Sequence, residues 1–71
     1  MENYKFRHIV RMVNGKNYEL ITKMHLNEDV INYIDSFKYI SLFDRKQKEM
    51  VTVKSAYVMS VMFKDSKQED N

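Results

Sequence analysis

The chain has 71 residues and few side chains that could carry out catalysis. It contains no cysteine, and its single glycine, Gly15, cannot form a glycine-rich phosphate loop. None of the usual nucleophile or zinc-hydrolase motifs is present. We therefore expect a protein that is not an enzyme. The candidate nucleophiles have no histidine nearby in the sequence; they are Ser36, Ser41, Ser55 and Ser60.

The acidic and imidazole groups also point to structural roles. Glu28 and Asp29 are adjacent, but they follow Asn27 and precede an apolar stripe, which is typical of the first turn of a helix. We interpret them as helix-start residues rather than an acid and base pair. His8 falls on an apolar strand face and His25 at the far end of the same hairpin, so a shared metal site would be strained. We predict no metal and no cofactor.

Basic residues form two groups that are candidates for binding nucleic acid. Lys5, Arg7 and Arg11 alternate along the first predicted strand, and Arg45, Lys46 and Lys48 occupy a later loop near Tyr39 and Phe43. Such a surface could follow phosphates and stack bases on aromatic rings. A solvated strand face and a solvated loop are the alternative, because Glu19 and Glu49 interrupt the two groups. The formal net charge of +2 is mild for a dedicated nucleic-acid binder.

The elements that would position these side chains begin with a hairpin. Residues 4–13 alternate between apolar and polar types, and residues 17–25 do so again after Asn14-Gly15. A two-residue turn would place Val10 opposite Glu19, whereas a three-residue loop over 13–15 places Val10 opposite Tyr18. The second register aligns the apolar faces. We therefore predict a bulged turn with Gly15 in the left-handed conformation.

The middle of the chain predicts one short helix. Asn27 is a good N-cap residue, and apolar side chains recur at helical spacing from Val30 to Phe37. We expect the helix to end near Ser36 or Phe37. Strand character returns over 39–44, and residues 45–48 form a hairpin loop.

The longest apolar segment is the last one in the chain, residues 50–63. Read with a period of two, it predicts a strand that is buried on at least one face. The residues that fall on one side are Val51, Val53, Tyr57, Met59, Val61 and Phe63. A single strand of this length would be unusual, so we expect a bend or 3₁₀ turn over 54–57. The predicted fold is α+β, in the order β-β-α-β-β(-β). It is either an antiparallel sheet or a small bent barrel with one short helix, formed by residues 1–64, with a disordered polar tail over 65–71.

Two segments resemble the bacterial Sm-like RNA chaperone Hfq. They are Val10 to Gly15, and Tyr39 to Phe43 together with Met50 to Val61. In that family, an apolar strand ending in Asn-Gly and a final strand pair broken by a Tyr-Lys-His-Ala turn build a bent five-stranded barrel that assembles into rings. Lys54 and Ala56 match that turn, with Ser55 in place of its histidine. The resemblance implies RNA binding, with Lys54 beside the other basic residues.

These observations lead to two expectations of function. The first is a non-enzymatic binding or regulatory module that docks on a protein partner and forms homo-oligomers. A composition rich in Lys, Asn, Ile and Tyr suggests an AT-rich genome, such as that of a low-GC bacterium or its phage. The small size and the absence of catalytic groups suggest an accessory protein of a phage or mobile element. It has no signal peptide or membrane-spanning segment, so we expect a cytoplasmic protein. The alternative is an Sm-like RNA binder that uses Lys5, Arg7, Arg11, Arg45, Lys46, Lys48 and Lys54; a small ligand held between protomers is a third possibility.

Overall fold

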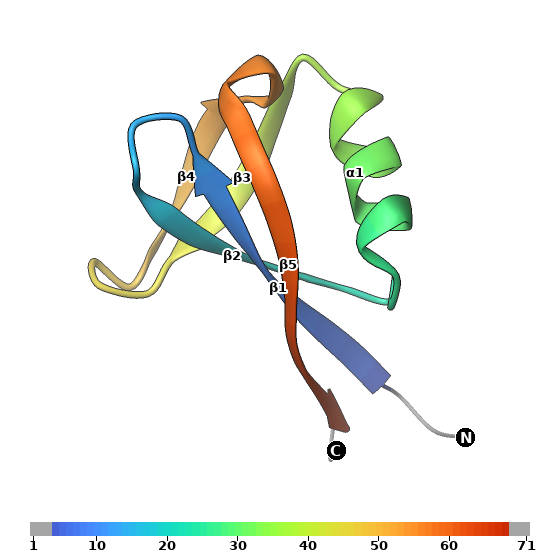
Figure 1. Cartoon of the computed structure of the whole chain (residues 1–71). Helices are drawn as coiled ribbons and strands as arrows, with labels where there is room; N and C mark the ends of the chain where they lie inside the picture. The colour runs from blue at the N-terminus through green and yellow to red at the C-terminus, as the bar shows by residue number, and fades with distance from the viewer. Residues whose placement is uncertain (1–3, 69–71) are drawn as a thin grey trace.

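A computed structural model describes residues 4–68, which form five strands and one short helix (Figure 1). This agrees with the predicted α+β class and element order. The elements in chain order are β1 (Tyr4–Met12), β2 (Asn17–Thr22), α1 (Asn27–Asp35), β3 (Tyr39–Asp44), β4 (Glu49–Lys54), the 3₁₀ turn η1 (Ser55–Tyr57) and β5 (Val58–Gln68).

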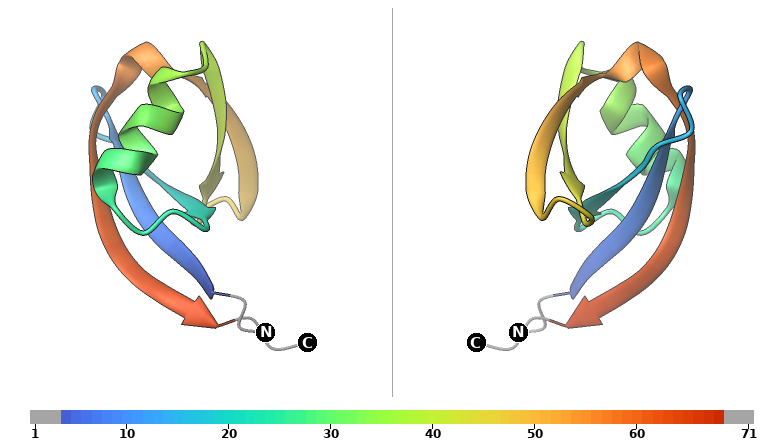
Figure 2. Two further views of the ribbon diagram at one scale, coloured as in Figure 1. Left: turned by 90° about the vertical axis from the view of Figure 1, so that its right-hand side faces the viewer. Right: turned by 90° about the vertical axis from the view of Figure 1, so that its left-hand side faces the viewer.

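The strands form one antiparallel sheet in the order β4-β3-β2-β1-β5. The sheet curls strongly, so that β3 and β4 face β1 and β5 across the core, and α1 lies in the opening beside β5 (Figure 2). In the described part of the chain, β4 pairs only with β3 and β5 only with β1. The bent sheet therefore keeps two edges, β4 and β5.

The register of the first hairpin confirms the bulged turn. Val10 lies opposite Tyr18 and His8 lies opposite Leu20. The amide of Met12 donates to the carbonyl of Lys16 at 2.9 Å. Gly15 adopts a φ of +88°, which a residue without a Cβ reaches at little cost. Apolar pattern and turn chemistry thus agree on the same register.

Helix α1 begins one residue earlier than predicted. Leu26 is the N-cap, with extended backbone, and its carbonyl accepts the amide of Val30 at 3.2 Å. The prediction of Asn27 as N-cap is wrong, because the chain has already turned into the helix there. Within the described part of the chain, no side chain caps this end. Val30 and Ile34 are buried, and they fasten the helix to the sheet.

The predicted break in the last apolar segment is confirmed, since η1 separates β4 from β5. Strand β5 is irregular as well. Its pairing with β1 shifts between Arg7 and His8 and again between Arg11 and Met12, which leaves Lys64 and Met59 as extra residues. The predicted burial is therefore wrong for Met59, the extra residue of a bulge, which is 62% exposed. It is also wrong for Tyr57, which lies in η1 and is 52% exposed, and for Phe63, which is 38% exposed.

The last strand also runs further than the sequence indicates. The prediction that residues from Asp65 onward are disordered is wrong for 65–68, because β5 continues to Gln68 and pairs there with β1. Asp65 lies opposite Arg7, and the ion pair between them holds this polar end of the strand in place. The remainder of the predicted tail, 69–71, lies outside the described residues.

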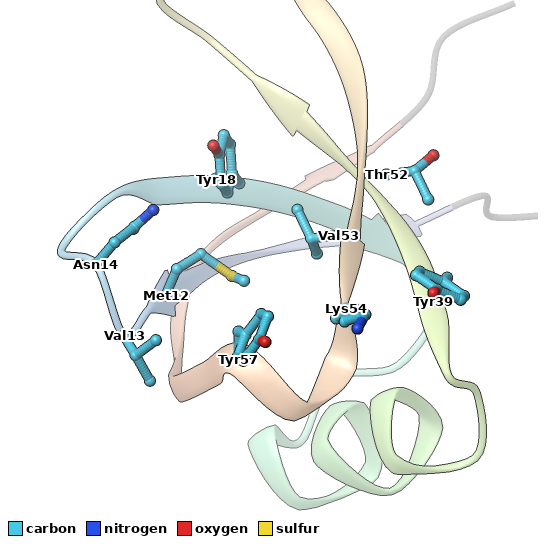
Figure 3. A pocket seen from close by; sticks show the side chains of 9 residues that line it. All are labelled: Met12, Val13, Asn14, Tyr18, Tyr39, Thr52, Val53, Lys54 and Tyr57. Carbon is cyan, nitrogen blue, oxygen red and sulfur yellow. The ribbon is translucent and has the colours of Figure 1, made fainter.

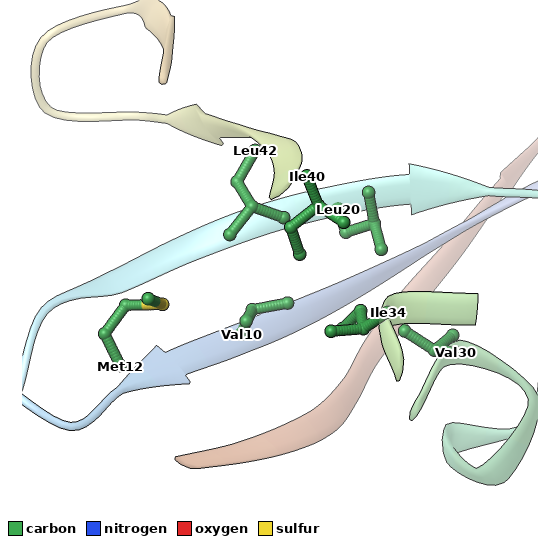
Figure 4. Packing of buried hydrophobic residues seen from close by; sticks show 7 residues of the cluster. All are labelled: Val10, Met12, Leu20, Val30, Ile34, Ile40 and Leu42. Carbon is green, nitrogen blue, oxygen red and sulfur yellow. The ribbon is translucent and has the colours of Figure 1, made fainter. Parts of the chain in front are cut away.

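The hydrophobic core lies inside the curl of the sheet and includes the buried face of α1 (Figure 4). Val10, Val30 and Leu42 are fully buried. No helix among residues 4–68 is long and apolar enough to cross a membrane. Among the described residues, the buried cluster comprises Val10, Met12, Leu20, Val30, Ile34, Ile40 and Leu42.

Candidate binding groove at the edge of strand β4

An open groove of about 400 Å³ lies at the free edge of β4, opposite the β1–β2 turn (Figure 3). We call it the β4 groove. Val53 points from β4 toward Met12 and Tyr18 on the core side, whereas Thr52 and Tyr39 lie on the other side of the strand. The lining residues are Met12, Val13, Asn14, Tyr18, Tyr39, Thr52, Val53, Lys54 and Tyr57.

The polar groups around the β4 groove are cationic or neutral. The Nζ atom of Lys54 lies 5.9 Å from the ring centroid of Tyr57, and that of Lys38 lies 6.0 Å from the ring centroid of Tyr39. None of the lining residues that the structure describes is acidic. Tyr39 and Tyr57 are each 52% exposed, so their rings are accessible to a binding partner.

Hydrogen bonds at η1 fix one end of the groove. The Ser55 hydroxyl donates to the carbonyls of Phe37 and Lys38, and its amide also donates to the Lys38 carbonyl at 3.0 Å. The amide of Val13 donates to the carbonyl of Tyr57 at 2.9 Å. These bonds tie η1 to the start of β3 and to the β1–β2 turn. The aromatic ring of Tyr57 is therefore presented from an anchored segment.

A separate charged cluster occupies the outer face of the sheet around Glu19. This carboxylate is only 5% exposed, although it lies on the solvent side of β2. The Nε atom of Arg45 donates to it at 2.6 Å, while Arg7 and Lys64 approach to 3.7 and 3.9 Å. Arg7 also makes two parallel hydrogen bonds to Asp65, at 2.9 and 2.7 Å. Three cations thus surround two carboxylates.

The hydrogen bonds in this cluster shift three ionisation equilibria. The bond from Arg45 lowers the pKa of Glu19, against the opposing effect of burial. The hydrogen bond from Arg7 lowers the pKa of Asp65 and in turn raises the pKa of Arg7. Both carboxylates therefore hold their charge to lower pH in the folded chain than in the unfolded chain.

The structure separates the basic residues named from the sequence into different environments. Arg7 and Arg45 meet at Glu19, where their charges are neutralised. Lys5 lies on the same outward face of β1, and Arg11 is exposed further along that strand. Lys46 and Lys48 lie in the β3–β4 turn, at the opposite end of β4 from Lys54. Of the seven candidates, only Lys54 lines the β4 groove.

The two histidines meet through one hydrogen bond. The Nε2 atom of His8, which is fully buried, lies 3.0 Å from the carbonyl oxygen of His25. A carbonyl only accepts, so Nε2 is the donor of this bond, while the buried Nδ1 has no hydrogen-bond partner among residues 4–68. Phe63 packs its ring edge against both imidazoles. This arrangement agrees with the structural role inferred for His8.

Most residues of the β4 groove were not recognised as a site from the sequence. Tyr18, Tyr39 and Tyr57 are far apart along the chain, and only the curl of the sheet brings them together. The sequence signals nearest to the site are the Asn14-Gly15 turn and the break after Lys54. Neither signal indicates that these two segments lie side by side in the fold.

Comparison with known proteins gives no further guidance on this site. No family model, curated protein or solved structure matches the chain.

Proposed function

We propose that this chain is a small non-enzymatic binding module that acts through protein–protein contacts, including contacts with further copies of itself. The observation that carries the proposal is the position of its exposed methionines. Met50 on edge strand β4 is 63% exposed, and Met59 and Met62 on edge strand β5 are 62% and 59% exposed. A partner that docks at either open edge would bury these large apolar side chains.

Methionine suits this role, because its flexible thioether side chain adapts to different partner surfaces. Ile31 of α1 lies beside Met59 and is 42% exposed. Phe63 follows Met62 along β5 and is 38% exposed. We call Ile31, Met59, Met62 and Phe63 the β5 patch and assign self-association to it. The β4 edge is then left for a different partner. We place the protein in the cytoplasm, as an accessory protein of a phage or a bacterium.

The second candidate is an Sm-like RNA-binding protein. The observation that favours it is the pairing of cations with exposed aromatic rings at Lys54 and Tyr57 and at Lys38 and Tyr39, which could stack bases and contact phosphates. The neutralisation of Arg7 and Arg45 by carboxylates weighs against it, since these guanidinium groups are already hydrogen-bonded.

A capture experiment separates the two candidates. The tagged full-length chain is incubated with lysate of the cell that encodes it, with and without nuclease, and bound proteins are identified by mass spectrometry. A protein-binding module recovers the same proteins in both arms. Recovery that disappears after nuclease treatment, and that weakens as salt rises, supports RNA binding instead. Recovery of nothing in either arm contradicts both candidates.

A further inference from the structure

We propose that the β4 edge and its groove receive an extended, acidic segment of a partner protein, which adds to the sheet as a sixth strand and places an aromatic or aliphatic side chain in the groove. This rests on the proposed protein-binding function, and it names the surface and the chemistry of the partner. Strand addition of this kind takes affinity from backbone hydrogen bonds and specificity from pockets for alternate side chains.

The backbone of β4 has the hydrogen-bonding groups that strand addition needs. The Ser55 amide donates to the carbonyl of Lys38, one position beyond the Tyr39–Lys54 pair that ends the β3–β4 ladder. Hydrogen-bonded and non-hydrogen-bonded pairs alternate along an antiparallel ladder. Lys54, Thr52 and Met50 therefore direct their amide and carbonyl groups away from β3, toward the free edge.

The groove offers contacts on both faces of the sheet edge, as the alternating side chains of an added strand require. The β4 groove extends to both sides of the strand edge: Met12 and Tyr18 lie on one side, and Tyr39 and Thr52 lie on the other (Figure 3). Successive side chains of an extended segment point to opposite faces. One side chain would enter the apolar part of the groove beside Tyr57, and its neighbours would lie against Tyr39.

The charges around the edge select an acidic segment. Lys54 lines the groove, Lys38 lies over the ring of Tyr39, and Lys46 and Lys48 lie in the turn at the other end of β4. Glu49 is the single acidic residue of β4. Strand β5 of a second copy fits this edge poorly, since its acidic residue, Asp65, is already bonded to Arg7 and its remaining charged residues are lysines. A separate protein with carboxylates near its apolar anchor is the better complement.

A peptide selection tests the proposal. The immobilised full-length chain is panned against a library of random linear peptides, and the enriched peptide is synthesised in three forms: unmodified, with alternate backbone amides N-methylated, and with its acidic residues replaced by amides. The enriched sequences are expected to be acidic, with apolar or aromatic residues at every second position. N-methylation should abolish binding, because it removes the backbone donors. Loss of the carboxylates should weaken it about tenfold or more.

Variants of the chain locate the binding surface. Thr52→Pro removes an amide that faces the free edge, a change that an edge strand tolerates, while Tyr57→Ala and Lys54→Glu remove one ring and reverse one charge of the groove. Each variant should weaken binding of the unmodified peptide about tenfold or more. Ile21→Ala should not weaken binding, because Ile21 lies on the central strand β2 and does not line the groove. Circular dichroism and the thermal midpoint confirm that each variant is folded.

Three results would overturn the proposal: no enrichment above that on an unrelated protein, equal binding of the N-methylated peptide, or binding that survives Thr52→Pro and Tyr57→Ala together. Displacement of the peptide by an oligouridine would reassign the groove to nucleic acid. If the capture experiment recovers the same protein with the wild type and with Thr52→Pro, the binding function stands and the β4 edge proposal fails.

Discussion

Replacing Leu42 by alanine is expected to lower the free energy of unfolding by about 2 to 5 kcal/mol. Leu42 is fully buried on the inner face of β3, where it belongs to the cluster that joins the sheet to α1. The smaller side chain loses apolar burial and leaves a cavity that a packed core closes only in part. A domain of this size has only about 3 to 5 kcal/mol in total, so the variant should be largely unfolded at moderate temperature.

Urea denaturation followed by circular dichroism measures the change, at low protein concentration so that self-association does not contribute. Ile21→Ala is the matched control, because it also shortens an aliphatic side chain in a strand, but one that is 50% exposed. Ile21→Ala should lower the free energy of unfolding by well under half as much as Leu42→Ala does. Equal losses at Leu42 and Ile21 would contradict the position of the core described above.

Replacing Glu19 by glutamine is expected to destabilise the chain by about 1 to 3 kcal/mol at neutral pH. The amide keeps the shape of the side chain but removes the charge that Arg45, Arg7 and Lys64 share. The partly exposed cations recover some hydration, which limits the loss. Glu49→Gln, an exposed position at the start of β4, is the matched control and should change stability little.

The same variant should change how stability depends on pH. The pKa of Glu19 is below its ordinary value of 4.5 in the folded chain. As the pH falls, the unfolded chain therefore binds more protons at this residue than the folded chain does. The contribution of Glu19 to the free energy of unfolding is complete above pH 4.5. It is lost as the pH falls through the pKa that Glu19 has in the folded chain. The wild type should therefore lose stability below pH 4.5 more steeply than Glu19→Gln, measured by urea denaturation across that range. Parallel curves for the two proteins would show that Glu19 is not the titrating group.

Local signals in the sequence were sufficient for much of the fold. Alternation along residues 4–13, the turn at Asn14-Gly15 and the matching of apolar faces determined the first hairpin, including its bulge. The break after Lys54 could be predicted because an unbroken strand over 50–63 would be too long for such a small sheet. In each case, the deciding interactions join residues close in sequence.

The errors arose where distant residues decide local structure. Residues 65–68 read as a polar tail, yet Asp65 is held by Arg7, 58 positions earlier in the chain. Met59 is exposed because β5 bulges against β1, and the alternating pattern contains no sign of a bulge. The sequence also contains no sign that Arg7 and Arg45 meet at Glu19, because the three residues are far apart along the chain.

The most direct test of a protein-binding module is whether the chain associates through the β5 patch, and sedimentation equilibrium from low to high micromolar concentration measures this. The wild type is predicted to shift from monomer to oligomer as concentration rises. The double variant Met59→Glu and Met62→Glu should remain monomeric, while Ile21→Glu, on the central strand β2, should associate like the wild type. A wild type that stays monomeric at high micromolar concentration, or association that Ile21→Glu abolishes and the double variant does not, would contradict the account.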